Sequence, residues 1–148
     1  MPAATHPEQH VTAKVSYEDD PRLLRLKSFL SRRNCPIEPL AADFIAAADR
    51  YNLDWRLLPA IAIMESGGGK RYLNNNIFGW DSCNVRFPSV RSGIHHVASR
   101  LATSVLYRDK SLDQVLRTYN PYDSYVRRVK SIMRALGPAD PDIVMIRN

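Results

Sequence analysis

The stretch WRLLPAIAIMESGGGKRYLNNNIFGW, residues 55–80, decides the fold of this 148-residue chain. Its first half is strongly apolar and ends at Glu65, and three consecutive glycines follow at residues 67–69. An apolar run that stops at glycine is typical of a helix packed among other helices. We therefore expect a helix that Asp54 caps and that ends near Ser66, followed by a loop rich in asparagine.

Apolar residues recur at helical spacing on both sides of this stretch. Asp20 and Pro21 have the form of an N-cap and a first helical residue, Ser111 to Gln114 that of a capping box, and Gly137 that of a C-cap. Strand signals are nearly absent, apart from a short extended piece at residues 84–87. The sequence thus predicts a compact all-α domain of five or six helices with little or no strand. The further helices are expected over residues 20–34, 40–51, 89–107, 111–119 and 124–136.

The domain organisation follows from where this periodicity begins and ends. Residues 1–19 are predicted to be a flexible leader, residues 20–137 a single domain, and residues 138–148 a loose tail. No apolar stretch approaches the roughly 20 residues that span a bilayer, and the opening residues lack the apolar centre of a signal peptide. We expect no transmembrane segment.

The chain carries a net charge of +6 and two cysteines. The charge favours an anionic partner, which could be a nucleic acid, a lipid surface or an acidic cell wall. No zinc-finger or RNA-binding aromatic motif accompanies the charge, so nucleic acid is not the expected partner. Cys35 and Cys83 could form one disulfide or remain two buried thiols, and they lack the partners of a metal site. No metal or cofactor is expected.

Glu65 is the candidate catalytic residue. On a helical wheel it lies between Ile61 and Leu58, in the middle of the apolar arc. A carboxyl held against apolar side chains resists ionisation, so its pKa should rise and it could serve as a general acid. That chemistry suits a glycosidic bond, whose leaving oxygen must be protonated. The alternative is an ordinary surface glutamate at the end of a helix.

The residues after Glu65 could bind a sugar polymer. Glycines leave room for a chain to approach, the amides of Asn74, Asn75 and Asn76 match sugar hydroxyl and N-acetyl groups, and aromatic rings offer apolar faces. Turn formation is the alternative role for the asparagines, and core packing is that of the rings. The candidate substrate-binding residues are Ser66, Asn75, Asn76, Phe78, Trp80 and Tyr122.

Four motifs, DWRLLPAIAIMESGGGK, NNNIFGW, FPSVRSGIHHVASRL and YNPYDSYVRRV, together resemble the peptidoglycan-cleaving domains of the lysozyme-like superfamily. The likeness covers about residues 39–136. It is greatest to the endo-β-N-acetylglucosaminidase-like domains, with features of soluble lytic transglycosylases. The resemblance implies that Glu65 is the catalytic acid, that Tyr119 lines the cleft near it, that residues 76–79 shape the cleft floor and that Ser66 bonds the helix end.

One departure from the glucosaminidase-like pattern concerns the second carboxylate. Those domains often carry it on a β-hairpin, whereas the corresponding segment of this chain is short and holds only Asp81. A hydrolase with two carboxylates needs them roughly 5 to 9.5 Å apart, and Asp81 is the candidate partner. A lytic transglycosylase needs only Glu65, because the sugar's own hydroxyl closes an anhydro ring. The sequence leaves both reactions open.

Three functions follow from the sequence. The first is cleavage of β-1,4 links in peptidoglycan by a monomeric enzyme that acts outside the cytoplasm, where that substrate lies. The second is a non-catalytic module that binds peptidoglycan or a related N-acetylated glycan. The third is a basic helical domain that binds nucleic acid, which only the charge suggests.

Overall fold

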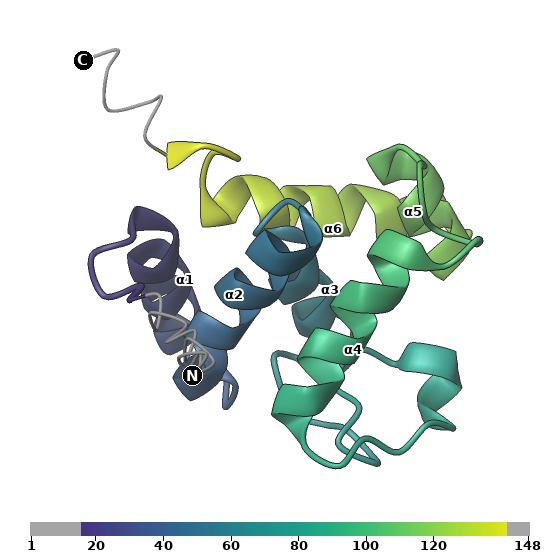
Figure 1. Cartoon of the computed structure of the whole chain (residues 1–148), viewed down its shortest axis with the longest axis horizontal. Helices are drawn as coiled ribbons and strands as arrows, with labels where there is room; N and C mark the ends of the chain where they lie inside the picture. Colours follow the sequence, from purple (N-terminus) through teal and green to yellow (C-terminus); the bar gives the residue numbers. More distant parts are fainter. Residues whose placement is uncertain (1–15, 142–148) are drawn as a thin grey trace, which may run out of the picture.

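The structure is a computed structural model and describes residues 16–141. Within that range it has helices only, with one isolated β-bridge between Leu73 and Asn76 and no strand (Figure 1). The prediction of an all-α domain of five or six helices is therefore confirmed. The elements are α1 (Pro21–Arg32), η1 (Glu38–Leu40), α2 (Ala41–Tyr51), α3 (Leu57–Ser66), η2 (Trp80–Cys83), α4 (Val90–Thr103), α5 (Leu112–Tyr119) and α6 (Asp123–Leu136), where η marks a short 3-10 helix.

The helix ends use the capping residues that the sequence predicts. Asp20 caps α1, with its carboxylate accepting from the backbone N–H of Arg22 at 2.9 Å. Ser111 and Gln114 form a reciprocal capping box at the start of α5. Gly67 ends α3 in the left-handed conformation, where a residue without Cβ carries no steric penalty. These local signals fix the helix boundaries to within a few residues.

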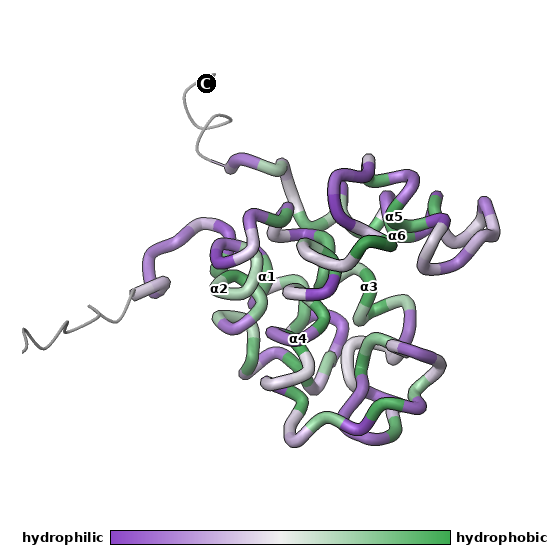
Figure 2. The backbone as a smooth tube through the Cα atoms, turned by 45° about the vertical axis from the view of Figure 1, so that its right-hand side comes forward, coloured by the Kyte–Doolittle hydropathy of each residue, from purple (hydrophilic) through white to green (hydrophobic). Residues whose placement is uncertain are grey.

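Helix α3 is the centre of the fold. All but three of its ten residues are buried, and α2, α6 and the loop after α3 pack around it. Figure 2 shows its tube as largely hydrophobic, with polar colours on the outer segments. Helices α2 and α4 pack closely against each other, and α6 lies along α3 (Figure 1). Burying a helix on nearly every side requires an apolar residue at nearly every position, which explains the run of residues 57–64.

Several boundaries differ from the prediction. Asp54 does not cap α3. Its carboxylate accepts from the backbone N–H of Arg56, which lies before the helix, and α3 begins at Leu57. Helix α4 ends at Thr103 rather than near Tyr107, because Ser104 takes an extended conformation and the following residues form turns. Val105 consequently lies on the surface instead of on the inner stripe of the helix. Residues 84–87 form no strand.

The chain just after α6 is fastened to the domain. The indole Nε1 of Trp55 donates to the carbonyls of Pro138 and Ala139 at 3.3 and 3.1 Å, and Arg56 donates to the carbonyl of Gly137 at 3.0 Å. The carbonyls of Pro138 and Ala139 are thus bonded to the domain, while the loose tail from residue 138 stays a prediction. The rest of that tail, and residues 1–15 of the predicted leader, lie outside the described residues.

Cys35 and Cys83 are both free thiols, so the structure has the second of the two predicted alternatives. Cys35 is buried, and burial raises the pKa of its thiol. Cys83 is only partly buried. None of the helices described between residues 16 and 141 is long and apolar enough to cross a bilayer.

Candidate functional site

Glu65 occupies the last turn of α3, where the chain leaves the core and the loop of residues 70–89 returns to it. Its carboxyl lies against the backbone of Gly79: a Cβ built on Gly79 would stand 2.6 Å from Oε2 of Glu65. Gly79 also has a φ of +60°, a conformation that favours glycine. Only a glycine at this position lets the carboxyl approach the loop so closely.

The environment of Glu65 is partly apolar and partly open. Leu58 and Ile61, which flank it on the helical wheel, are buried, whereas Glu65 itself is exposed at the surface. The helical wheel therefore places Glu65 on the side of α3 that carries Leu58 and Ile61, but it overstates the burial of the Glu65 side chain. Desolvation still raises the pKa of the carboxyl, and a contact with the Tyr125 hydroxyl partly offsets that rise. Within residues 16–141, no lysine, arginine or histidine forms an ion pair with Glu65.

Two tyrosines, Tyr119 and Tyr125, lie near the Glu65 carboxyl. Tyr119 and Tyr125 stack with their ring centroids 6.3 Å apart and their planes nearly parallel. The Tyr119 hydroxyl donates to the carbonyl of Phe78, next to Gly79. The Tyr125 hydroxyl is buried and faces Glu65, although no acceptor in the described part of the chain meets full hydrogen-bond geometry with it. Burial is the main cause that raises the pKa of both phenols, and the charge of neighbouring groups raises it further. Both phenols therefore keep their protons.

A groove of about 400 Å³ opens on the Gly79 side of Glu65. Trp80 forms its aromatic floor, with ring centroids 5.7 Å from Tyr107 and 5.9 Å from Tyr119. The predicted residues Trp80, Asp81 and Tyr119 are thus brought together in one hollow. Its lining consists of Gly79, Trp80, Asp81, Ser82, Val85, Leu106, Tyr107 and Tyr119.

A second hollow, of about 190 Å³, lies at the start of α6, and two neighbours of Glu65, Met64 and Tyr125, line it. It is lined by Met64, Asn120, Tyr122, Ser124, Tyr125 and Arg128. Tyr122, a predicted substrate-binding residue, is 71% exposed here and belongs to this hollow rather than to the groove. The site therefore has two recesses, and the stacked pair of Tyr119 and Tyr125 contributes one ring to each.

The asparagines hold the loop together instead of facing the groove. The side-chain amide of Asn74 donates to the carbonyl of Cys83 at 2.8 Å, and that of Asn75 to Phe87 at 3.0 Å. Asn76 is buried and uses both ends of its amide on the backbone of Trp80, at 2.8 and 2.9 Å. The predicted substrate contact of Asn76 is corrected, because its buried amide bonds the loop at both ends, whereas that of the partly exposed Asn75, which does not line the groove, stays a prediction.

Ser66 and Phe78 are corrected as well. The Ser66 hydroxyl is buried, donates to the carbonyl of Ala62 at 2.9 Å and accepts from the N–H of Gly69 at 3.1 Å. It therefore stabilises the end of α3, as the resemblance implies, and has no exposed atom to offer a substrate. Phe78 is fully buried and packs edge-on against Phe44. Its contribution to the site is its carbonyl, which holds Tyr119.

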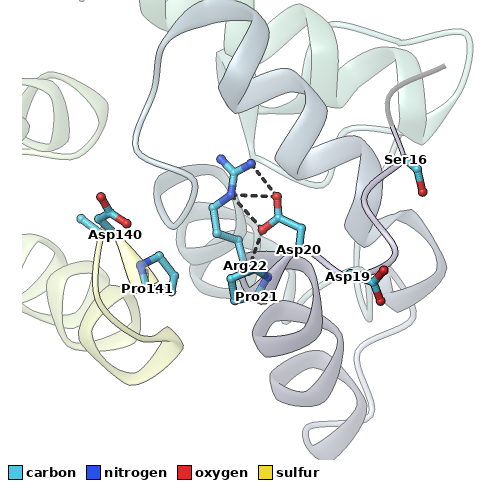
Figure 3. A pocket seen from close by; sticks show the side chains of 8 residues that line it. Ser16, Asp19, Asp20, Pro21, Arg22, Asp140 and Pro141 are labelled. Atoms are coloured by element: carbon cyan, nitrogen blue, oxygen red, sulfur yellow. Dashed lines mark hydrogen bonds and ion pairs between the residues drawn. The ribbon is translucent and has the colours of Figure 1, made fainter. Parts of the chain in front are cut away.

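A more voluminous hollow than either of these recesses lies elsewhere. It measures about 690 Å³ and is formed by the start of α1 and the residues after α6 (Figure 3). Asp20 and Arg22 lie within it and are joined by hydrogen bonds, and Arg22 also pairs with Asp49 at 2.6 Å. No aromatic ring lines it. The residues of this hollow offer paired charges rather than an isolated acid beside apolar faces.

Sequence reasoning missed two residues that shape the site. The sequence analysis places Tyr125 only within the helix expected over residues 124–136, and Gly79 only in the segment 76–79 that the resemblance assigns to the cleft floor. Helical periodicity cannot distinguish a tyrosine that fills the core from one whose hydroxyl meets a carboxyl. The signal that could have indicated Gly79 is its place after a buried aromatic residue in a segment with no helical or strand period.

Comparison of the chain with known protein families, with curated proteins and with solved structures finds no match. Among residues 16–141, no group of three or more histidine, cysteine, aspartate or glutamate side chains is arranged to hold a metal ion. The site is therefore interpreted from its own geometry.

Proposed function

We propose that this chain cleaves β-1,4-glycosidic bonds in bacterial peptidoglycan, with Glu65 as the general acid. The observation that carries the proposal is a carboxyl with a raised pKa and no cationic partner among the described residues, which lies against Gly79 of a recess lined with aromatic rings and faces Tyr125 of a second recess. A surface glutamate without a function would instead be fully solvated or paired. A carboxyl that retains its proton closer to neutral pH is what protonation of a glycosidic oxygen requires.

The roles of the other residues follow from the same geometry. The exposed face of Trp80 offers a flat apolar surface to a sugar ring. Tyr119 is a positioning residue: its hydroxyl holds the carbonyl of Phe78 and so fixes Gly79 against the Glu65 carboxyl. The positive net charge of the chain supports binding to an acidic cell wall. A protein with this substrate acts outside the cytoplasm.

Asp81 lines the groove and is the candidate for a second carboxylate. With Asp81 as base or nucleophile, water would replace the leaving sugar and leave a reducing end. With Glu65 acting alone, it would protonate the leaving oxygen and then accept the proton of the sugar's own hydroxyl, which leaves an anhydro end. Mass spectrometry of the released fragments distinguishes the two, because their masses differ by one water.

Replacing Glu65 by glutamine tests the proposal, because glutamine keeps the shape of the side chain and removes the acid. We expect the rate of peptidoglycan solubilisation to fall by about 10²- to 10⁴-fold, the usual contribution of a general acid. Glu18→Gln is the matched control, since Glu18 is exposed on the segment before α1 and lines neither recess.

Two results would contradict the proposal. One is a Glu65→Gln variant that clears a peptidoglycan suspension as fast as the wild type and the Glu18→Gln variant. The other is a wild-type protein that binds insoluble peptidoglycan but releases no fragments, which would identify the chain as a binding module.

A further inference from the structure

The smaller recess beside Glu65 is rich in hydrogen-bond donors. No carboxylate lines it, and its polar members are Arg128, Asn120, Ser124 and Tyr122. We call it the Arg128 pocket, defined by its lining residues Met64, Asn120, Tyr122, Ser124, Tyr125 and Arg128. A recess lined by a guanidinium and neutral donors favours an anionic ligand.

Arg128 differs from the paired arginines of the molecule. Arg22, Arg56 and Arg117 each form an ion pair with an aspartate. Within residues 16–141 no carboxylate pairs with Arg128. It lies one helical turn after Ser124 on α6, so both side chains stand on the face that borders the pocket.

The neighbouring groups add to this preference. Asn120 uses its side-chain oxygen to accept from the N–H of Tyr122 at 3.1 Å, and its NH₂ group has no acceptor in the described part of the chain. The pocket lies at the N-terminal end of α6, a helix of 14 residues, whose dipole is positive there. Asp123 is the acidic residue of that first turn, and Arg117 pairs with it. Arg128 and the N-terminal end of α6 thus contribute positive charge at the pocket, and Arg117 pairs with the nearby Asp123.

The pocket is next to the proposed acid. Met64 directly precedes Glu65, and the Tyr125 hydroxyl faces the Glu65 carboxyl. Tyr125 in turn stacks on Tyr119, which lines the groove. A polymer that lies in the groove with a bond at Glu65 would therefore present its next unit, or a substituent of the sugar at the cleavage point, to the Arg128 pocket.

We propose that the Arg128 pocket binds a carboxylate carried by a substituent of the glycan, and that Arg128 determines specificity for acid-bearing chains over neutral N-acetylated ones. This inference rests on the proposed function for its cleavage readout. The planar guanidinium can bond both oxygens of one carboxylate, while Asn120 and Ser124 supply neutral donors beside it.

The test compares two substrates: peptidoglycan with its free carboxylates, and the same material after those groups are converted to amides. We expect Arg128→Gln to raise the half-saturating concentration of the untreated substrate about tenfold and to leave that of the amidated substrate unchanged. Arg128→Lys should restore part of the preference, because it returns the charge but not the fork of donors. Arg127→Gln is the matched control: it removes the same charge from an exposed neighbour that does not line the pocket.

A binding measurement separates this inference from the proposed cleavage. Calorimetry with a soluble muropeptide on the Glu65→Gln protein should show about tenfold weaker binding when Arg128→Gln is added, and no such loss with the amidated muropeptide. If the wild type cleaves no peptidoglycan and Arg128→Gln still weakens muropeptide binding, the cleavage proposal fails and the carboxylate pocket stands. If the wild type cleaves both substrates equally well, or if Arg128→Gln weakens both to the same extent, the pocket does not read a carboxylate.

Discussion

Asp20, in the hollow at the start of α1, and Glu65, against Gly79 at the edge of the groove, are two acids with opposite surroundings. In the hollow between α1 and residues 139–141, Arg22 bonds Asp20 from 2.8 Å, and this holds the pKa of that carboxyl below its usual range. Beside the groove, Glu65 has no cationic partner within residues 16–141, and burial holds its pKa above the usual range. The first arrangement stabilises the fold, because the ionised acid is paired. The second leaves an acid able to give up a proton.

The comparison teaches that the size of a recess is a poor guide to its use. The larger hollow has nearly twice the volume of the groove but holds paired charges and no aromatic face. The groove is smaller, and its acid is held close to a backbone by one glycine. The predictions below test whether the acids of the two recesses differ in this way, from the largest effect to the smallest.

Gly79→Ala should give the largest effect. The new Cβ would stand 2.6 Å from Oε2 of Glu65 and would sit on a backbone with a φ of +60°, so the carboxyl has to move. We expect the cleavage rate to fall by at least about tenfold. We also expect the free energy of unfolding to fall by about 1 to 2 kcal/mol, because of the strained backbone. Rate assays and denaturant unfolding measure the two separately.

Gly67→Ala is the matched control for this change. Gly67 has nearly the same φ, +63°, but a Cβ there meets only the Lys70 side chain, at 3.4 Å. Its backbone strain should therefore be similar while the Glu65 carboxyl stays in place. Equal loss of rate in the two variants would mean that the contact between Gly79 and Glu65 is irrelevant to the chemistry.

Arg22→Gln should lower the free energy of unfolding by about 1 kcal/mol at pH 7. Because Arg22 depresses the pKa of Asp20, the stability from this pair is present above the unfolded pKa of about 3.9 and is lost as the pH falls through the lower folded pKa. The difference between the variant and the wild type should therefore shrink toward pH 2. Lys27→Gln, an exposed residue of the same helix, is the control.

The free energy of unfolding of the Glu65→Gln variant, measured over the same pH range, should differ from that of the wild type with the opposite sign. A raised carboxyl pKa means that the acid contributes stability below the unfolded pKa of about 4.3 and loses it as the pH rises through the higher folded pKa. At pH 7 the variant should thus be slightly more stable than the wild type, by less than about 1 kcal/mol because solvent screens this exposed carboxyl. Destabilisation of both variants at pH 7 would remove the contrast between the two recesses.

Tyr125→Phe should produce the smallest effect, a shift of the pH profile. The Tyr125 hydroxyl favours the ionised form of Glu65, so its removal should raise the pKa of the acid further. The alkaline limb of kcat/KM should then move to higher pH, because the acid stays protonated over a wider range. Tyr107→Phe, which removes a tyrosine hydroxyl from the groove instead, should leave the limb in place, and an unmoved limb in both variants would show that Tyr125 does not act on Glu65.

The helical part of the fold could be predicted from the sequence because its signals are local. Asp20, Ser111 and Gly67 act within one turn of the chain, and the apolar period of each helix reflects its own burial. The end of α4 was missed because Val105 continues the apolar period although the chain has already turned at Ser104. Local pattern does not encode that change of direction.

The candidate site was only partly predictable, for a different reason. Glu65, Trp80 and Tyr119 were found as residue types suited to sugar chemistry; Trp80 and Tyr119 line one recess, and the Glu65 carboxyl lies against Gly79, which lines it too. Asn76 was misassigned because the same amide can bond a sugar or a carbonyl of its own loop, and composition cannot distinguish the two. Arg128 could not be singled out among the basic residues of the sequence, since only the fold brings it to the hollow beside Met64.

The two tryptophans lie in different surroundings and can serve as intrinsic fluorescence probes. Trp80 is partly exposed on the floor of the groove, whereas Trp55 is buried and bonded to the chain after α6. A molecule that enters the groove changes the surroundings of one indole and leaves the other untouched. Intrinsic fluorescence can therefore follow occupancy through Trp80, and replacing Trp55 by phenylalanine would isolate that emission without any attached dye.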